Sequence, residues 1–298
     1  MGSFDVVGFG ESSIDYVYVL PALPAPRVSK LRVSAHFSSC GGQVATAMTA
    51  CAALGLRASY LGPLGNDDNG QRVLAELRAE GVDVSRAIVR EAASRYAVIL
   101  VDKRTGDRCV IWDRDPRLHV DAAEMPDHLF AGARVLHVDG VDEEASIAAA
   151  NRGRSLGLIV TSDIDTVAAR TAELVAAVTI PIFAEHVPAQ LTGETNIESA
   201  LRALRLRHDG LLMVTLGERG SAALDGDRFY EVPAPQVKTV DTTGAGDVFR
   251  AAVIYGLLER WTTEELLRFA NNAAALSCTR RGAMAAVPRL AEVRGALV

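Results

Sequence analysis

Short apolar runs rich in β-branched residues alternate along this chain with longer stretches rich in alanine and leucine. The short runs have the length of strands, and the longer stretches have the pattern of helices. The predicted strands are residues 6–9, 58–61, 134–138, 158–161, 179–183 and 211–215, and the predicted helices are residues 43–54, 69–80, 143–156, 166–177 and 197–207. This alternation predicts an α/β fold with a parallel sheet covered by helices on both faces. A later pair of runs, 221–224 and 229–232, is separated by Asp225-Gly226-Asp227, which indicates a β-hairpin.

Two further pairs of strand-like runs have no helix between them. These are residues 15–20 with 31–37, and residues 96–101 with 108–112, the second pair being joined by a polar turn. We expect them to form a small inserted β-sheet, from about residues 12–38 and 95–115, that covers a site as a lid. The alternative is that they extend the edge of the main sheet.

Composition excludes several classes of protein. Apolar residues make up 49% of the chain, charged residues 23%, and the net charge is −6, which is typical of a globular enzyme and unfavourable for a nucleic-acid partner. No apolar stretch approaches the roughly 20 residues needed to span a bilayer. The N-terminal residues lead directly into a strand-like run, so we expect no signal peptide. The four cysteines form no C-x-x-C pair, and we expect a cytoplasmic protein without a membrane partner.

The segment from Asp241 to Asp247 (DTTGAGD) carries the clearest chemical signal. Its glycines allow a tight turn and a close backbone approach to a ligand, and it leads into an apolar helical pattern. Unpaired amides at a helix start bind anions. An aspartate beside such a site suits a hydroxyl that attacks a phosphate, so the segment indicates phosphoryl transfer. It is not a P-loop, because no G-x-x-x-x-G-K-[ST] occurs in the chain.

Three other features precede it. Gly41-Gly42 stands directly before a predicted helix, a turn-rich loop covers residues 61–70, and Asp15 lies at the start of the expected lid. The paired glycines allow a ligand to approach backbone amides, and the Asp15 carboxylate could accept hydrogen bonds from two sugar hydroxyls. Taken singly, the glycine pair is equally consistent with a strand-to-helix turn, the loop indicates only a turn and a helix cap, and an isolated Asp15 is more typical of a surface charge on an edge strand.

In this order, the four features resemble the PfkB, or ribokinase-like, family of carbohydrate kinases over nearly the whole chain. The stretch from Gly41-Gly42 to residues 65–70 is similar to the family's N-terminal signature, and residues 241–247 to its C-terminal one. The resemblance implies one domain over residues 1–298, a Rossmann-type three-layer α/β/α body with a β lid, ATP, Mg²⁺, and a homodimer through the lids. A monovalent cation is left open.

The resemblance also implies residue roles. Asp247 would be the catalytic base, with Gly244, Ala245 and Gly246 as the anion hole. Asp15, Gly41 and Gly42 would hold the sugar. The expected nucleotide contacts are Thr215, Gly217, Gly220, Thr243, Gly244, Gly246 and, on a late helix, Asn271 in preference to Asn272.

The chain departs from the family pattern at two places. Thr46 replaces the usual asparagine of the first signature, so the sugar contact expected from Thr46 must differ. The N-x-x-E motif of the Mg²⁺ region would fall on residues 184–187, where neither its Asn nor its Glu is kept. Glu185 lies beside the expected position and is the predicted metal residue, acting through water. These changes resemble the branch that holds ketohexokinase-like and sulfofructose-kinase-like proteins.

We therefore predict an ATP-dependent sugar kinase that phosphorylates a primary hydroxyl, with a ketose such as fructose favoured. A nucleoside kinase of the same family is one alternative. A phosphosugar kinase is another, because Arg114 and Arg117 could bind a phosphate. A non-catalytic sugar sensor is a more distant alternative.

Overall fold

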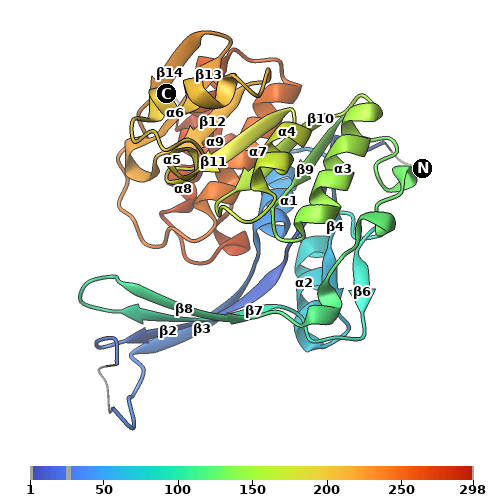
Figure 1. The fold of residues 1–298 in the computed structure, drawn as a ribbon. Coiled ribbons are helices and arrows are strands. Elements are labelled where there is room, and N and C mark those ends of the chain that lie inside the picture. The colour runs from blue at the N-terminus through green and yellow to red at the C-terminus, as the bar shows by residue number, and fades with distance from the viewer. Residues whose placement is uncertain (1–2, 25–27, 297–298) are drawn as a thin grey trace.

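The computed structural model describes residues 3–24 and 28–296. Its main sheet has eight strands in the order β14-β13-β12-β11-β10-β9-β1-β4 (Figure 1). The strands are β1 Val6–Phe9, β4 Ala58–Leu61, β9 Val135–Val138, β10 Ile159–Ile164, β11 Ile180–Ala184, β12 Leu212–Thr215, β13 Ser221–Asp225 and β14 Arg228–Val232. In this order, the adjacent strands from β12 through β4 pair in parallel, whereas β12 with β13 and β13 with β14 pair in antiparallel fashion. The predicted parallel sheet and terminal hairpin are confirmed.

Helices cover both faces of this sheet. One face carries α1 Gln43–Ala53, α2 Asp68–Ala79, α7 Ala245–Leu258, α8 Thr263–Ser277 and α9 Leu290–Gly295, and the other carries α3 Glu143–Ser155, α4 Thr171–Ala177, α5 Val187–Thr192 and α6 Ile197–Arg205. Successive side chains of a strand point to opposite faces, so Val6 packs into the first core and Val7 into the second. The body is therefore a three-layer α/β/α sandwich.

A second, four-stranded sheet, which we call the lid sheet, has the order β3-β2-β7-β8. It is built from β2 Ser13–Leu20, β3 Ala35–Gly41, β7 Tyr96–Asp102 and β8 Arg108–Asp113. The lid sheet extends away from the body (Figure 1) and is separate from the main sheet. The alternative of an extended main-sheet edge is therefore wrong. A short parallel pair joins β5 Pro63–Gly65, in the stretch 61–70 that was expected to be loop, to β6 Ile88–Arg90, for which no element was predicted.

Three predicted boundaries were wrong, each for a local reason. Strand β3 lies later than predicted because it pairs with β2 in the register that sets Gly41 opposite Ser13. Strand β10 continues past residue 161 because its polar residues Ser162 and Asp163 are buried in the sheet. Helix α4 begins at Thr171 rather than 166, because the amide of Arg170 donates to the Glu143 carboxylate at 3.0 Å instead of to a helical carbonyl.

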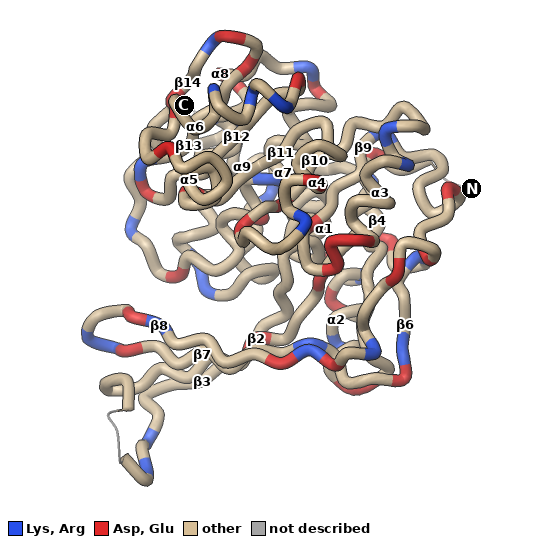
Figure 2. The backbone as a smooth tube through the Cα atoms, in the orientation of Figure 1, with Lys and Arg blue, Asp and Glu red and all other residues tan. Residues whose placement is uncertain are grey.

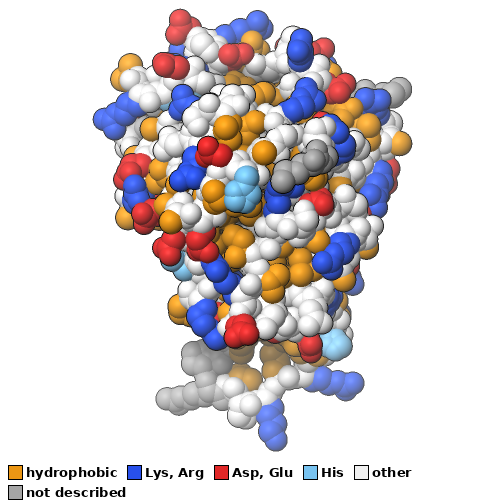
Figure 3. All heavy atoms as spheres, turned by 90° about the vertical axis from the view of Figure 1, so that its right-hand side faces the viewer, with side chains coloured by type: hydrophobic (Ala, Val, Ile, Leu, Met, Phe, Trp, Pro, Cys, Tyr) orange, Lys and Arg blue, Asp and Glu red, His pale blue; other side chains and the backbone are white. Residues whose placement is uncertain are grey.

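Charges of both signs are spread along the backbone of the body and the lid sheet (Figure 2). The face shown in Figure 3 likewise mixes apolar, basic and acidic side chains. Among the helices of residues 3–24 and 28–296, none combines the length and the apolar character that a membrane crossing requires.

Candidate active site

The segment 241–247 forms the turn that leads into α7. Both carboxylate oxygens of Asp241 accept hydrogen bonds: Oδ1 from the Thr243 amide at 3.0 Å and from Thr243 Oγ1 at 2.8 Å, and Oδ2 from the Gly282 amide at 3.0 Å. Gly244 has φ +80°, a conformation that side chains rarely adopt. Helix α7 begins at Ala245, whose amide donates to the Thr242 carbonyl at 3.3 Å, whereas the amides of Gly246 and Asp247 have no partner within the helix. We call residues 241–247 the anion loop, because they present these amides beside two cavities.

The anion loop is a wall shared by two cavities. One, of about 630 Å³, lies toward the lid sheet, and Thr243, Gly244 and Asp247 line it. The other, of about 380 Å³, lies toward α8, and Thr242, Ala245 and Gly246 line it. We call them the lid-side cavity and the body-side cavity. Two ligands, one in each cavity, would therefore meet at this loop.

Asp247 lies against a buried ion pair. Arg250, one turn further along α7, contacts Asp163 at the end of β10, with 2.6 Å between Nη2 and Oδ1 and side chains only 4% and 2% exposed. Asp163 also lies within hydrogen-bond reach of Asp247. Burial raises the pKa of Asp247 well above its ordinary value and the Asp163 charge raises it further, whereas Arg250 opposes both effects. A carboxylate with a raised pKa that faces a cavity is suited to accept a proton.

Asp15 and the paired glycines lie across the lid-side cavity. Asp15 is on β2, lines the cavity, and accepts a hydrogen bond from Ser13 Oγ at 3.0 Å. Burial raises the pKa of its carboxyl group. A Cβ at Gly41 would stand 2.7 Å from Asp15 Oδ2, and Gly42, at φ +94°, lines the cavity itself. The structure thus brings Asp15, Gly41, Gly42 and Asp247 to one place.

Thr46 lies differently from what we expected. It is fully buried on α1, its Oγ1 has no hydrogen-bond partner in the described residues, and its side chain packs beneath Gly244. It is absent from the residues that line the lid-side cavity. Thr243, which was expected at the nucleotide, faces the lid-side cavity and bonds Asp241.

Sequence reasoning missed a charged cluster at the base of the lid sheet. Glu11, only 7% exposed, lines the lid-side cavity between Arg95, whose Nε lies 2.9 Å away, and Arg114, whose Nε lies 3.3 Å away. Burial raises the pKa of Glu11 to about 7. The sequence indicated Arg114 only as a residue that could bind a phosphate, and Glu11 and Arg95 belong to no motif that we used. The three residues are distant in the chain, so no pattern in a single sequence predicted the cluster.

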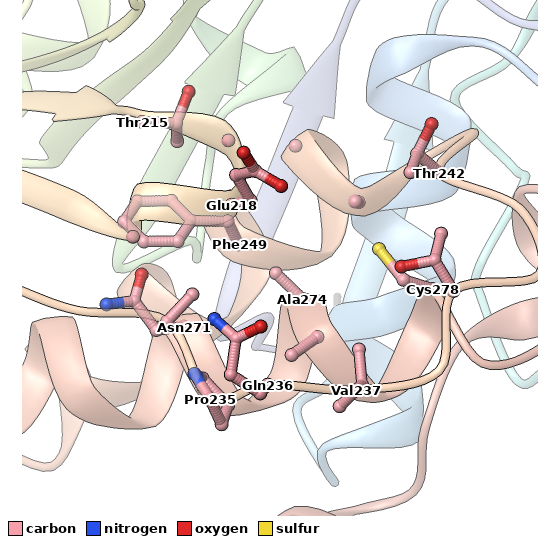
Figure 4. A pocket seen from close by; sticks show the side chains of 17 residues that line it. Thr215, Glu218, Pro235, Gln236, Val237, Thr242, Phe249, Asn271, Ala274 and Cys278 are labelled. Carbon is pink, nitrogen blue, oxygen red and sulfur yellow. The ribbon is translucent and has the colours of Figure 1, made fainter.

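The body-side cavity is formed by separate segments (Figure 4). Thr215 ends β12, Gly217 and Gly220 follow it, and all three line the cavity. Asn271 and Cys278 line it from α8 and its C-terminal cap. The side-chain Nδ2 of Asn271 donates a hydrogen bond to the Val232 carbonyl at 2.8 Å, which leaves the side-chain Oδ1 for a ligand. Asn272 is absent from this lining, and a nucleotide contact by Asn271 stays a prediction.

Glu185, the predicted metal residue, lines neither cavity of the anion loop. It is about half exposed and pairs with Arg219 at 2.5 Å beside a third cavity. Within the described part of the chain, no group of three or more His, Cys, Asp or Glu side chains is arranged to hold a metal ion.

Comparisons with known proteins identify the family of this chain. The family model described as "pfkB family carbohydrate kinase" matches residues 3–290. The chain belongs to this family. It is a carbohydrate kinase, a phosphotransferase whose acceptor is a sugar hydroxyl.

Similar proteins share its full length. Fructokinase-1 of Oryza sativa is 30% identical over 97% of this chain and 96% of its own. A putative ribokinase from Agrobacterium tumefaciens has a TM-score of 0.92 at 27% identity, over 99% and 98% of the two chains. A ribokinase from Arabidopsis thaliana, solved with ribose and ATP, shares the fold at a TM-score of 0.84 and 24% identity, over 99% of each chain. The ribokinase-like fold is confirmed, and the narrower ketohexokinase-like branch stays a prediction.

The cavities of this kinase suit a nucleotide and Mg²⁺. The anion loop offers backbone amides at a helix start, as phosphates require. Mg²⁺ is usually bound by one or two carboxylates together with phosphates and waters, so a dedicated cluster is unnecessary. Asp165 lines the lid-side cavity and has no ion pair among the described residues, which makes it a better candidate than Glu185.

Proposed function

We propose that this carbohydrate kinase transfers the γ-phosphate of ATP to a primary hydroxyl of a ketose such as fructose, with Asp247 as general base. One observation carries the proposal. Asp247 lies at the start of α7, on the loop that separates the lid-side cavity from the body-side cavity. A base in that position can reach the hydroxyl of a ligand on one side while the amides beside it bind a phosphate on the other.

In this mechanism the sugar occupies the lid-side cavity, held by Asp15 and Gly42, and its primary hydroxyl faces Asp247. Asp247 accepts the hydroxyl proton as the oxygen attacks the γ-phosphorus, and the bond from that phosphorus to the bridging oxygen breaks, so that ADP leaves. The amides of Gly244, Ala245 and Gly246 would bind the transferring oxygens, which acquire charge in the transition state. Bound Mg²⁺ would neutralise further phosphate charge.

The charges around the lid-side cavity favour a neutral sugar over a phosphosugar. Arg114 contacts both Glu11 and Asp142, the latter at 2.7 Å, so its charge is already compensated. Arg117 pairs with Asp115, is 66% exposed, and is absent from the cavity lining. Similarity to fructokinases supports a ketose. No feature of this cavity specifically favours a nucleoside.

We further propose that the lid sheet mediates a homodimer. Strand β8 is an edge strand whose residues are all exposed, among them the apolar Val110, Ile111 and Trp112. Exposed apolar edges are commonly covered by a partner. We also propose a cytoplasmic location, which the four free cysteines support.

The dimer proposal has a direct test. Val110 and Trp112 line the lid-side cavity, so Ile111 between them points to the other face of β8. Ile111→Glu is expected to shift the protein from dimer to monomer in sedimentation velocity. Glu91→Gln, an exposed change outside the lid sheet, is the control. A parent protein that sediments as a monomer at micromolar concentration would refute the dimer.

An assay of ADP release on a substrate panel tests the proposed function. The panel contains fructose, glucose, ribose, adenosine and fructose 6-phosphate, each measured with ATP and Mg²⁺, with and without K⁺. We expect the highest kcat/KM for fructose, because the lid-side cavity has compensated charges and several hydroxyl-binding groups. The K⁺ series measures monovalent-cation dependence.

The other outcomes separate the alternatives. Preference for adenosine would support a nucleoside kinase, and preference for fructose 6-phosphate a phosphosugar kinase. Sugar binding by calorimetry without ADP release on any substrate would identify a sensor, and would overturn the role of Asp247.

A further inference from the structure

An arginine of the lid sheet contacts the anion loop. Arg108 begins β8, and its Nη2 donates to Asp241 Oδ1 at 2.9 Å while its Nη1 donates to Thr243 Oγ1 at 3.1 Å. More than 130 residues separate these partners in the chain. A guanidinium that makes two charge-assisted contacts fixes orientation as well as distance.

This contact joins two walls of one cavity. Strands β7 and β8 supply Ala97, Ile99, Val110 and Trp112 to the lid-side cavity, and the anion loop supplies Thr243, Gly244 and Asp247. Arg108 donates both of the hydrogen bonds that join the described residues of the β7–β8 hairpin to those of the anion loop. Pairing with β2 holds the hairpin in the lid sheet, and Arg108 is the side chain that joins the hairpin to the anion loop.

The anion loop has its own internal supports. Apart from the contact with Arg108, Asp241 accepts hydrogen bonds from the amides of Thr243 and Gly282, and its side chain is only 11% exposed. Arg108 is 34% exposed, and ion pairs at such positions add little to folding stability. Arg108 is thus better suited to place the hairpin relative to the loop than to stabilise the fold.

We propose that Arg108 is a positioning residue for phosphoryl transfer, which ties the β7–β8 hairpin to the anion loop and so couples closure of the lid-side cavity to the place of Asp247. The inference rests on the proposed function for its kinetic consequence. Bound sugar is enclosed between the hairpin and Asp247, and water is excluded from the transferring phosphate.

The test compares Arg108→Ala with Arg104→Ala and Arg108→Lys. Arg104 is an arginine of the same hairpin whose side chain bonds Asp102 within the hairpin and does not reach the loop. For Arg108→Ala we expect kcat to fall about 10- to 100-fold, because a small misplacement of the reacting groups has this effect. The KM for ATP should change less than about twofold, and ATP hydrolysis without sugar should rise relative to transfer. Arg104→Ala should behave as the parent, and Arg108→Lys, which cannot make both contacts, should recover part of the rate.

Hydrogen exchange by mass spectrometry supplies a readout that needs no turnover. Arg108→Ala should exchange faster over residues 96–113 and over the anion loop, with thermal unfolding unchanged, and Arg104→Ala should leave the anion loop at the parent rate. Parent-like kcat and exchange in Arg108→Ala would overturn the inference, as would equal effects of Arg104→Ala. If the parent phosphorylates no sugar, the proposed function fails, whereas the exchange comparison still decides whether Arg108 couples the two walls.

Discussion

Asp247→Asn is expected to lower kcat for sugar phosphorylation by about 10²- to 10⁴-fold, the usual contribution of a general base. The amide has the size of the carboxylate but cannot accept the hydroxyl proton. The affinity for sugar, measured by calorimetry, should change little. Stability should be equal or higher, because Asp247 is held beside Asp163 in a setting that disfavours its charge.

Asp227→Asn, on the exposed turn between β13 and β14, is the matched control and should keep the activity of the parent. Turnover within a few-fold of the parent in Asp247→Asn would show that another group accepts the proton. Loss of sugar affinity together with turnover would instead give Asp247 a binding role.

Arg250→Met is expected to destabilise the protein by about 3–5 kcal/mol, the usual effect of removing one partner of a buried ion pair. The change leaves Asp163 buried at 2% exposure without its counter-charge. Urea unfolding at pH 7 measures the loss. The control is Arg268→Met on α8, whose pair with Glu264 is exposed on both sides and should contribute less than about 1 kcal/mol.

The double variant Asp163→Asn with Arg250→Met removes both buried charges and should recover part of the stability. A loss below about 1 kcal/mol in Arg250→Met alone would mean that the Asp163 carboxyl group is already neutral in the folded protein.

Arg250→Met is also expected to change the pH dependence of kcat/KM. Asp247 must be ionised to act as a base, and its raised pKa means that activity falls on the acid side at a higher pH than for an ordinary carboxyl group. Arg250 lowers this pKa, whereas Asp163 and Asp165 raise it. Removing Arg250 should therefore move the acid limb of kcat/KM to still higher pH. A limb that stays in place or moves to lower pH would contradict the assigned electrostatics.

Several elements could be predicted because their signal is local. The parallel strands and most helices follow from runs of apolar residues, and residues 241–247 carry their glycines and aspartates within a few positions of one another. The C-terminal part of strand β10 could not be predicted in this way. Ser162 and Asp163 are polar in the sequence but buried in the sheet, because Asp163 finds its counter-charge in Arg250 on a helix far along the chain.

The same limit applies to Glu185, the predicted metal residue. Glu185 follows β11 and lies beside the position that the motif indicated, but Arg219 pairs with it in the folded chain. Thr46 likewise lies within the first signature, where a sugar contact was expected, and packing beneath Gly244 buries it. A motif assigns a residue to a position in the chain, whereas the neighbours that decide its chemistry come from other elements.

By itself, the sequence determined the α/β body, the paired strands outside the alternating pattern and the glycine-rich turn at residues 241–247, because hydrophobic periodicity and glycine conformation act over short distances. The kinase family followed from the resemblance of two motifs to the family's signatures. Tertiary structure alone decided that the anion loop is the wall between two cavities, that Asp163 and Arg250 lie beside Asp247, that Glu11 lines the lid-side cavity, and that Arg108 contacts the anion loop. These relations depend on electrostatics and packing between residues that are distant in the chain, and no pattern along the chain records them.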